Sequence, residues 1–198
     1  MTFEEYKIEV IRHELGHWLM AGHLRFKRGG IRIKILCNRS GFGHEGSATI
    51  YPMHDLTSSA SIMKYAENRI STLFAGIAAQ MLFGNDGSSA KSEKLLDEYG
   101  ADDKGKIEEL IHIVRGIVKA GSMSMENEIE HKNEVRSRCW KTAVQYLEKS
   151  KPILAHMSSC VASQVTQANE EYAFEHDQLC RWFADASSPK HKDACAEP

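Results

Sequence analysis

Near its amino terminus the chain reads His13-Glu14-Leu15-Gly16-His17, which is the pattern HExxH. On a helix, a spacing of four residues places both imidazoles on one face, about one turn apart, where they can bind the same zinc ion. Glu14 does not share that face and suits a different role, because a carboxylate there can take a proton from a water that the metal makes acidic. The pattern therefore predicts a zinc site with His13 and His17 as ligands and Glu14 as the catalytic base.

The residues around this motif favour a helix. Thr2 and Glu5 have the spacing of a capping box, in which each side chain satisfies a free backbone N–H of the first turn. Gly22 can end the helix after about Ala21. Gly16 lies between the two histidines and would allow another backbone to approach closely. We therefore expect the motif to lie on a capped first helix that packs tightly against a neighbour.

A zinc ion held by two histidines needs a third protein ligand, and the residues alone leave three candidates open. His23 has the spacing of a metzincin ligand, but Met20 stands where that class needs a glycine. Glu67 lies on the second predicted helix, as the third ligand of gluzincins does. Asp102 or Asp103 lies at the start of the third predicted helix, where a carboxylate could equally cap the helix.

The rest of the chain predicts a mainly α protein with a small β-sheet or hairpin between the first two long helices. Residues 31–36 alternate apolar and basic side chains, which indicates a half-buried strand, and residues 47–51 read as a second strand after a glycine-rich turn at 40–46. Apolar residues at helical spacing then predict helices over about 59–83 and 102–121, a carboxyl-terminal helical hairpin broken at Lys151-Pro152, and a short last helix around 179–183.

The length of 198 residues suits one domain. We expect that domain to span residues 1–184, with 122–184 as its carboxyl-terminal helical part. Residues 185–198 are small, charged or proline and predict a flexible tail.

Composition narrows the class of protein. The formal net charge of −2 disfavours a nucleic-acid binder, and we read the basic cluster from Arg25 to Lys34 as a solvated strand face. No apolar stretch is long enough to span a bilayer, and no secretory signal precedes the first helix. The five cysteines are odd in number and lack CxxC spacing, which favours reduced thiols and a cytoplasmic location.

Several motifs together resemble the peptidase domain of FtsH-type ATP-dependent zinc proteases. That family has HEAGH on its first helix, then a strand pair that ends in proline, as at Pro52, and then a helix that ends in small residues and Phe83-Gly84. Its third zinc ligand is an aspartate that opens the following helix, where this chain has Gly100-Ala101-Asp102-Asp103. The apolar residue four positions after that aspartate matches Ile107 if Asp103 is the ligand, so the resemblance favours Asp103 over Asp102. It covers about residues 5–184.

The resemblance implies an ATP-independent zinc metalloendopeptidase, because the sequence contains neither the AAA+ ATPase module nor the membrane anchor of the family. One zinc ion per chain would be held by His13, His17 and Asp103. The implied partner is a polypeptide substrate, an unfolded segment or a peptide, held in extended form along a substrate-binding strand of Ser47, Ala48, Thr49 and Ile50. The ring assemblies of the family raise a homo-oligomer as a further, open expectation.

Two alternatives stay open at this stage. One is a different HExxH hydrolase that uses Glu67 as its third ligand. The other is a zinc-binding regulatory module with little turnover; the presence of Glu14 argues against it, whereas Trp18 favours it because a large side chain after the second histidine would narrow the space beside the zinc. We interpret His44-Glu45, within the glycine-rich turn, as part of a solvated loop rather than as a lining of the cleft.

Overall fold

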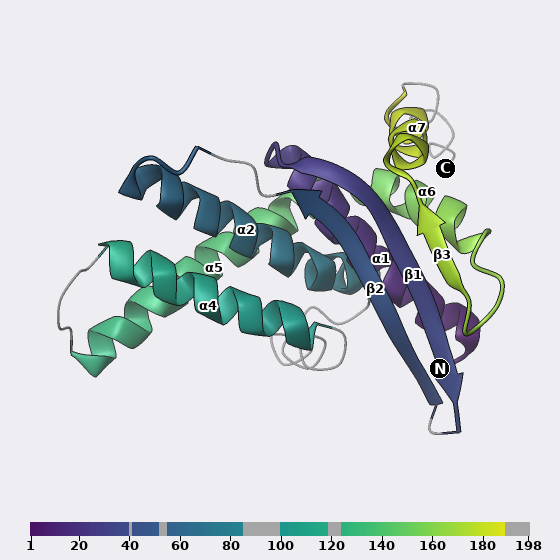
Figure 1. Ribbon diagram of the computed structural model, residues 1–198, viewed down its shortest axis with the longest axis horizontal. Coiled ribbons are helices and arrows are strands. Elements are labelled where there is room, and N and C mark those ends of the chain that lie inside the picture. The colour runs from purple at the N-terminus through teal and green to yellow at the C-terminus, as the bar shows by residue number, and fades with distance from the viewer. Residues whose placement is uncertain (40, 52–54, 85–99, 119–123, 189–198) are drawn as a thin grey trace, which may run out of the picture.

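The computed structural model describes residues 1–39, 41–51, 55–84, 100–118 and 124–188. It confirms a mainly helical protein with a small antiparallel sheet that follows the first helix (Figure 1). In chain order the elements are α1 (Phe3–His23), β1 (Lys27–Asn38), β2 (Gly41–Tyr51), α2 (Ser59–Met81), α4 (Ala101–Val118), α5 (Met125–Lys149), α6 (Lys151–Ala162), β3 (Glu171–Phe174) and α7 (His176–Ser187).

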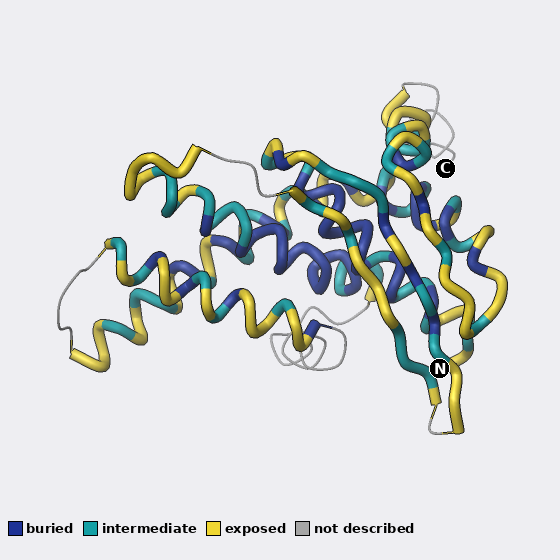
Figure 2. The backbone as a smooth tube through the Cα atoms, in the orientation of Figure 1, coloured by how far each residue is buried: buried dark blue, intermediate teal, exposed yellow. Residues whose placement is uncertain are grey.

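Helix α1 is the central element of the core. The predicted capping box is present, since the Glu5 N–H donates to the Thr2 hydroxyl at 3.2 Å and the Thr2 N–H donates to the Glu5 carboxylate at 2.8 Å. Buried residues concentrate along α1 and α2 in the middle of the molecule (Figure 2). A Cβ added at Gly16 would lie 2.3 Å from the Ala75 carbonyl oxygen, so the expected close approach at Gly16 is the contact between α1 and α2.

The sheet has the order β2-β1-β3, which leaves β2 as an edge strand. Ile31, Ile33 and Ile35 of β1 are buried, as their alternation predicted. The glycine-rich turn predicted at 40–46 is wrong for residues 41–46, which already belong to β2 and pair with β1 from Asn38↔Gly41 onward. The reason is tertiary, because the Phe42 ring packs on the rings of Phe3 and Tyr6 from α1.

Strand β3 has no counterpart in the sequence expectations. It is four residues long and pairs antiparallel with β1 from Ile31↔Phe174 to Lys34↔Glu171. A strand this short carries almost no periodicity of its own, and its partner lies about 140 residues earlier in the chain. Its position beside β1 is therefore decided by burial of Phe174 in the core, where this side chain is 2% exposed.

The carboxyl-terminal helices begin and end close to their predicted positions. Ser150 alone separates α5 from α6, and Pro152 lies in the first turn of α6, where its missing N–H costs nothing. Helix α7 continues to Ser187, so residues 185–187 are helical and not part of the predicted tail. Residues 189–198 and the predicted helix end at Gly121 lie outside the described residues. Within the described ranges, none of the helices combines the length and hydropathy that a membrane span requires.

Candidate metal centre

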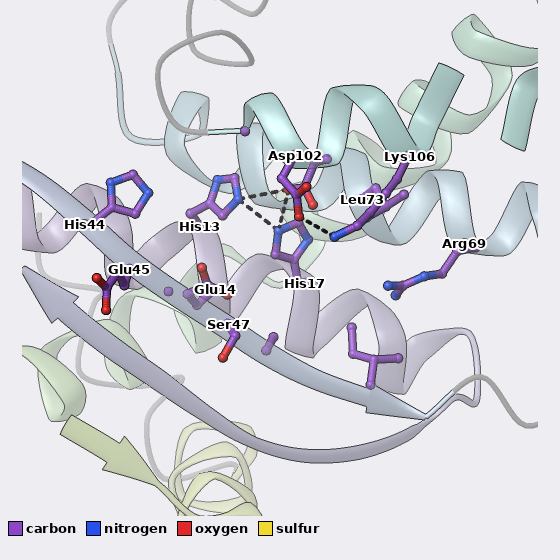
Figure 3. Close-up of a pocket in the computed structure, with 15 residues that line it drawn as sticks. His13, Glu14, His17, His44, Glu45, Ser47, Arg69, Leu73, Asp102 and Lys106 are labelled. Carbon is purple, nitrogen blue, oxygen red and sulfur yellow. Dashed lines mark hydrogen bonds and ion pairs between the residues drawn. The ribbon is translucent and has the colours of Figure 1, made fainter. Parts of the chain in front are cut away.

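His13 and His17 of α1, labelled in Figure 3, converge on a single point with Asp103 of α4. Asp103 Oδ2 lies 3.1 Å from His13 Nε2 and 3.0 Å from His17 Nε2, and the two Nε2 atoms are 2.9 Å apart. Both imidazoles are buried, and the Asp103 side chain is 15% exposed. The three residues offer one ligand atom each, all within 4.8 Å of one another, and could hold a metal ion.

The outer nitrogens of the two rings determine what the inner nitrogens present. His17 Nδ1 lies 2.8 Å from the Thr72 carbonyl oxygen, which can only accept, so this nitrogen carries the proton. His13 Nδ1 lies 3.3 Å from Gln80 Oε1 and can donate in the same way. Metal-binding histidines commonly donate their second N–H to an oxygen in this manner. If both rings are neutral, each directs the lone pair of Nε2 toward the other ring and toward the Asp103 carboxylate, and these three acceptors need a cation among them.

The charges of the group shift its proton affinities. Burial by itself would lower the pKa of His17, but the negative charge and hydrogen bond of Asp103, with Glu14 and the Thr72 carbonyl, raise it to about 9. Burial would raise the pKa of Asp103, but the charge of His17 and hydrogen bonds from both imidazoles hold it well below its usual range. A proton therefore fills the cation's place when no metal does, and a metal ion would compete with that proton.

Glu14 lies beside this group and is 5% exposed. Burial raises the pKa of its carboxyl group, against the opposing effect of the charges on His13 and His17. A Cβ added at Gly46 would lie 2.4 Å from Glu14 Oε1, so the backbone of β2 passes directly over the carboxylate. The catalytic-base candidate is thus positioned between the metal group and the edge strand.

Helix α2 supplies a face that sequence reasoning missed. Thr72, Gly76 and Gln80 follow one another at a spacing of four and therefore share one side of the helix. A Cβ at Gly76 would lie 2.6 Å from His17 Cε1 and 2.7 Å from His13 Nε2, so the two rings rest on bare backbone. The signal in the sequence was this stripe of polar, small and polar residues within the predominantly apolar second half of α2, residues 70–81.

The metal group opens into a cleft of about 470 Å³ between α1, β2, α2 and α4. Of the strand residues predicted to bind substrate, Ser47, Ala48 and Ile50 line this cleft, whereas Thr49 lies beside Gly29 of β1 and does not. His44 and Glu45 also line the cleft (Figure 3), so their interpretation as a solvated loop is wrong. The Tyr6 hydroxyl lies 2.9 Å from His44 Nδ1 and ties this end of β2 to α1.

The competing third ligands do not join the metal group, although Asp102 also lines the cleft. The Asp102 side chain is 90% exposed and forms an ion pair with Lys106. The His23 ring stacks on Tyr146 with ring centroids 4.1 Å apart. Glu67 forms an ion pair with Arg138. Among the described residues, the metal-type group contains Asp103 and none of these three.

Trp18 does not narrow the cleft, contrary to expectation. It is fully buried, its Nε1 donates to the Gly29 carbonyl at 2.9 Å, and the Arg28 guanidinium lies 3.6 Å above its ring. One residue along a helix is a rotation of about 100°, which turns Trp18 away from the face of His13 and His17 and under the sheet.

The sequence has no match among models of known protein families or among curated proteins. A functional interpretation therefore depends on what the metal group, Glu14 and the cleft can do chemically.

Proposed function

We propose that this chain is an ATP-independent zinc metalloendopeptidase that hydrolyses peptide bonds in unfolded segments or short peptides. The observation that carries the proposal is the shared cleft. The Glu14 carboxylate and the group of His13, His17 and Asp103 open into it together, beside the edge strand β2. The motif resemblance to FtsH-type peptidases points to the same chemistry.

The donor set suits zinc. Two imidazole nitrogens and one carboxylate oxygen are zinc ligands of ordinary type, and three protein ligands leave a position open for chemistry. A zinc ion held by His13, His17 and Asp103 would polarise a peptide carbonyl and lower the pKa of a water to about 7.

Glu14 has the position and environment of the proton carrier in this reaction. As the water oxygen attacks the peptide carbonyl carbon, Glu14 accepts the proton that the water loses. When the C–N bond breaks, Glu14 returns that proton to the amine nitrogen, so the carboxylate ends the cycle unchanged. Its near-complete burial keeps bulk water from competing for the proton.

The edge strand offers a way to hold the substrate. One side of β2 pairs with β1, and no strand of the described residues pairs with its other side, which could add an extended peptide through main-chain hydrogen bonds. Recognition through main-chain groups depends little on sequence and requires an unfolded substrate. Folded proteins would therefore be poor substrates in the absence of an unfolding partner.

Neither alternative function gains support. A regulatory zinc module has no use for the buried Glu14 carboxylate in the cleft, and Trp18, which favoured that reading, lies away from the cleft. A hydrolase with Glu67 as ligand would need that residue in the metal group, but Glu67 is paired with Arg138.

The test compares the wild-type chain with Glu14→Gln. The zinc content of each protein is measured by inductively coupled plasma mass spectrometry. Proteolysis is measured with a chemically unfolded protein as the substrate. We expect both proteins to bind one zinc ion and the variant to lose about 100-fold or more of the cleavage rate, since that is the usual contribution of a general base. Equal cleavage by the two proteins, or a wild type that binds no zinc, would contradict the proposal.

A further inference from the structure

The charged residues of the metal cleft are distributed unevenly along its length. His44 and Glu45 lie at one end, Arg69 and Lys106 lie at the other, and the histidine pair lies between them (Figure 3). A peptide that lies along β2 would therefore pass from the acidic end, over the metal group, to the basic end.

Most of these charges are already paired. Lys106 Nζ lies 2.5 Å from Asp102 Oδ2, and Glu45 Oε2 lies 3.3 Å from Lys34 Nζ. Arg69 differs, because within the described part of the chain its guanidinium has neither an ion pair nor a hydrogen bond, although it lines the cleft and points along it toward His17 (Figure 3). A guanidinium presents a planar set of N–H donors that matches a carboxylate.

The helix fixes how far Arg69 lies from the metal group. Gly76, whose backbone supports both imidazoles, is seven residues further along α2. At a rise of 1.5 Å per residue this separation is about 10 Å along the helix axis. An extended peptide advances about 3.3 Å per residue, so Arg69 lies opposite a group roughly two or three residues from the bond above His13 and His17.

We propose that Arg69 is a specificity-determining residue that binds a carboxylate of the peptide about two or three residues from the cleaved bond. The carboxylate can come from an aspartate or glutamate side chain or from a free carboxyl terminus. This inference deepens the proposed peptidase function and rests on it for the position of the cleaved bond.

A single carboxylate fits the cleft better than a phosphate does. Lys106 is paired with Asp102, which leaves Arg69 as the unpaired cationic side chain among the described residues that line the cleft. The carboxylates of Glu14, Glu45 and Asp103 also line the cleft and would repel a dianion more strongly than a monoanion.

The test uses unstructured twelve-residue peptides with an amidated carboxyl terminus and otherwise uncharged side chains. In the first set a single glutamate is moved through the sequence, and in the second set glutamine replaces that glutamate. A third set compares free with amidated termini. The value of kcat/KM at each cleaved bond is measured by mass spectrometry for the wild type, Arg69→Gln, Arg69→Lys and Arg181→Gln. Arg181 is exposed on α7, so its variant removes the same charge outside the cleft.

We expect the wild type to prefer the glutamate peptide, or the free terminus, by about tenfold or more at one or two adjacent positions. Arg69→Gln should bring kcat/KM for each glutamate peptide to that of its glutamine twin, Arg69→Lys should restore part of the preference, and Arg181→Gln should keep it. Cleavage by the wild type with no glutamate or terminal preference, or a preference that Arg69→Gln retains, would overturn the role of Arg69 and leave the peptidase proposal intact.

A binding measurement on variants without the Glu14 carboxylate tests the role of Arg69 independently of peptide cleavage. The zinc-loaded Glu14→Gln variant and the double variant Glu14→Gln, Arg69→Gln are titrated with the same peptides by calorimetry. Tighter binding of the glutamate peptide to the single variant alone supports the Arg69 site even if the wild type cleaves nothing, in which case the peptidase proposal fails by itself. Equal binding of both twins to both variants counts against the Arg69 site.

Discussion

Asp102 and Asp103 are neighbours in the chain with opposite environments. Asp103 faces the two imidazoles of α1, whereas Asp102 extends into solvent and pairs with Lys106. One step along α4 turns a side chain by about 100°, and this rotation separates a candidate metal ligand from a surface carboxylate.

Removal of Asp103 should abolish the metal site. We expect Asp103→Ala to weaken zinc binding by roughly 100-fold or more, beyond the 10–100-fold typical of losing an outer hydrogen-bond partner. Asp102→Ala and Glu67→Ala are the matched controls, since each removes a carboxylate outside the group. Competition with a fluorescent zinc chelator measures the affinities. A loss in either control as large as in Asp103→Ala would show that the ligand set is wrong.

The stability of the metal-free protein should depend on the protonation of His17. The pKa of this residue is about 9 in the folded chain and about 6.5 when unfolded, because the folded state places its imidazole against Asp103. A raised pKa in the folded state contributes stability that is fully present below pH 6.5 and is lost as the pH rises to about 9. Urea unfolding of chelator-treated protein at pH 6, 7.5 and 9 should show this decline.

His17→Asn is the control for that decline, because its side chain does not titrate in the range. Metal binding should show the opposite dependence, since ligation requires the neutral imidazole and improves as the pH rises. A metal-free wild type whose stability is constant or increases from pH 6.5 to 9 would contradict the assigned pairing of His17 with Asp103.

At the scale of the elements, the site depends on how closely α2 approaches α1. Gly16 meets the Ala75 carbonyl, and Gly76 meets the imidazoles of His13 and His17. Gly16 thus allows the α2 backbone to approach α1, and Gly76 leaves room on α2 for the two imidazoles. The polar face of α2, with Thr72 and Gln80 bonded to the rings, then holds the histidines in the tautomer that a metal requires.

Gly16→Ala should separate these helices. A Cβ there would lie 2.3 Å from a backbone oxygen that cannot rotate away, so we expect a loss of about 1–3 kcal/mol in the free energy of unfolding together with weaker metal binding. Gly116→Ala on α4 is the control, because its Cβ would meet nothing within 4 Å and should stabilise the protein by about 0.5–1 kcal/mol. Thermal and urea unfolding measure both. Equal effects of the two substitutions would mean that the α1–α2 contact is not tight.

At the scale of the whole molecule, a metal ion would join segments that are far apart in the chain. His13 and His17 belong to α1, and Asp103 opens α4, some 90 residues later. The ligand bonds would therefore tie α4 to the central helix α1, whereas the apolar side of α4, with Ile107, Ile111 and Val114 buried, packs on α2 and α5.

Zinc should stabilise the whole fold for this reason. A ligand that binds the folded state at 100 times its dissociation constant adds about 2.7 kcal/mol to the free energy of unfolding. We expect the melting temperature to fall on treatment with a chelator and to recover on addition of zinc, but not of magnesium, which prefers oxygen ligands. Asp103→Ala should melt at the same temperature with and without zinc. A wild type that shows no change would contradict a resident metal site.

Local sequence determined much of this protein. The HExxH spacing, the capping box and the helical stripes each depend on residues within a few turns of one another, and the structure has α1 and the other main helices where these patterns predicted them. The two histidines were identifiable because four residues along a helix is a fixed distance. Gly16 was identifiable as a contact point because a residue without a Cβ on a helix allows another backbone to approach closely.

Tertiary structure decided the rest. The choice of Asp103 over Asp102 and Glu67, the extension of β2 through His44 and Glu45, and the addition of β3 to the sheet all depend on which distant segments pack together. Spacing along the chain cannot specify these contacts, because they arise from burial of side chains such as Phe42 and Phe174 against elements elsewhere in the sequence. The sequence by itself therefore determined the chemistry available on α1 and, through the motif resemblance, favoured Asp103, whereas the folded chain decided that the Asp103 carboxylate meets the two imidazoles and which strand borders them.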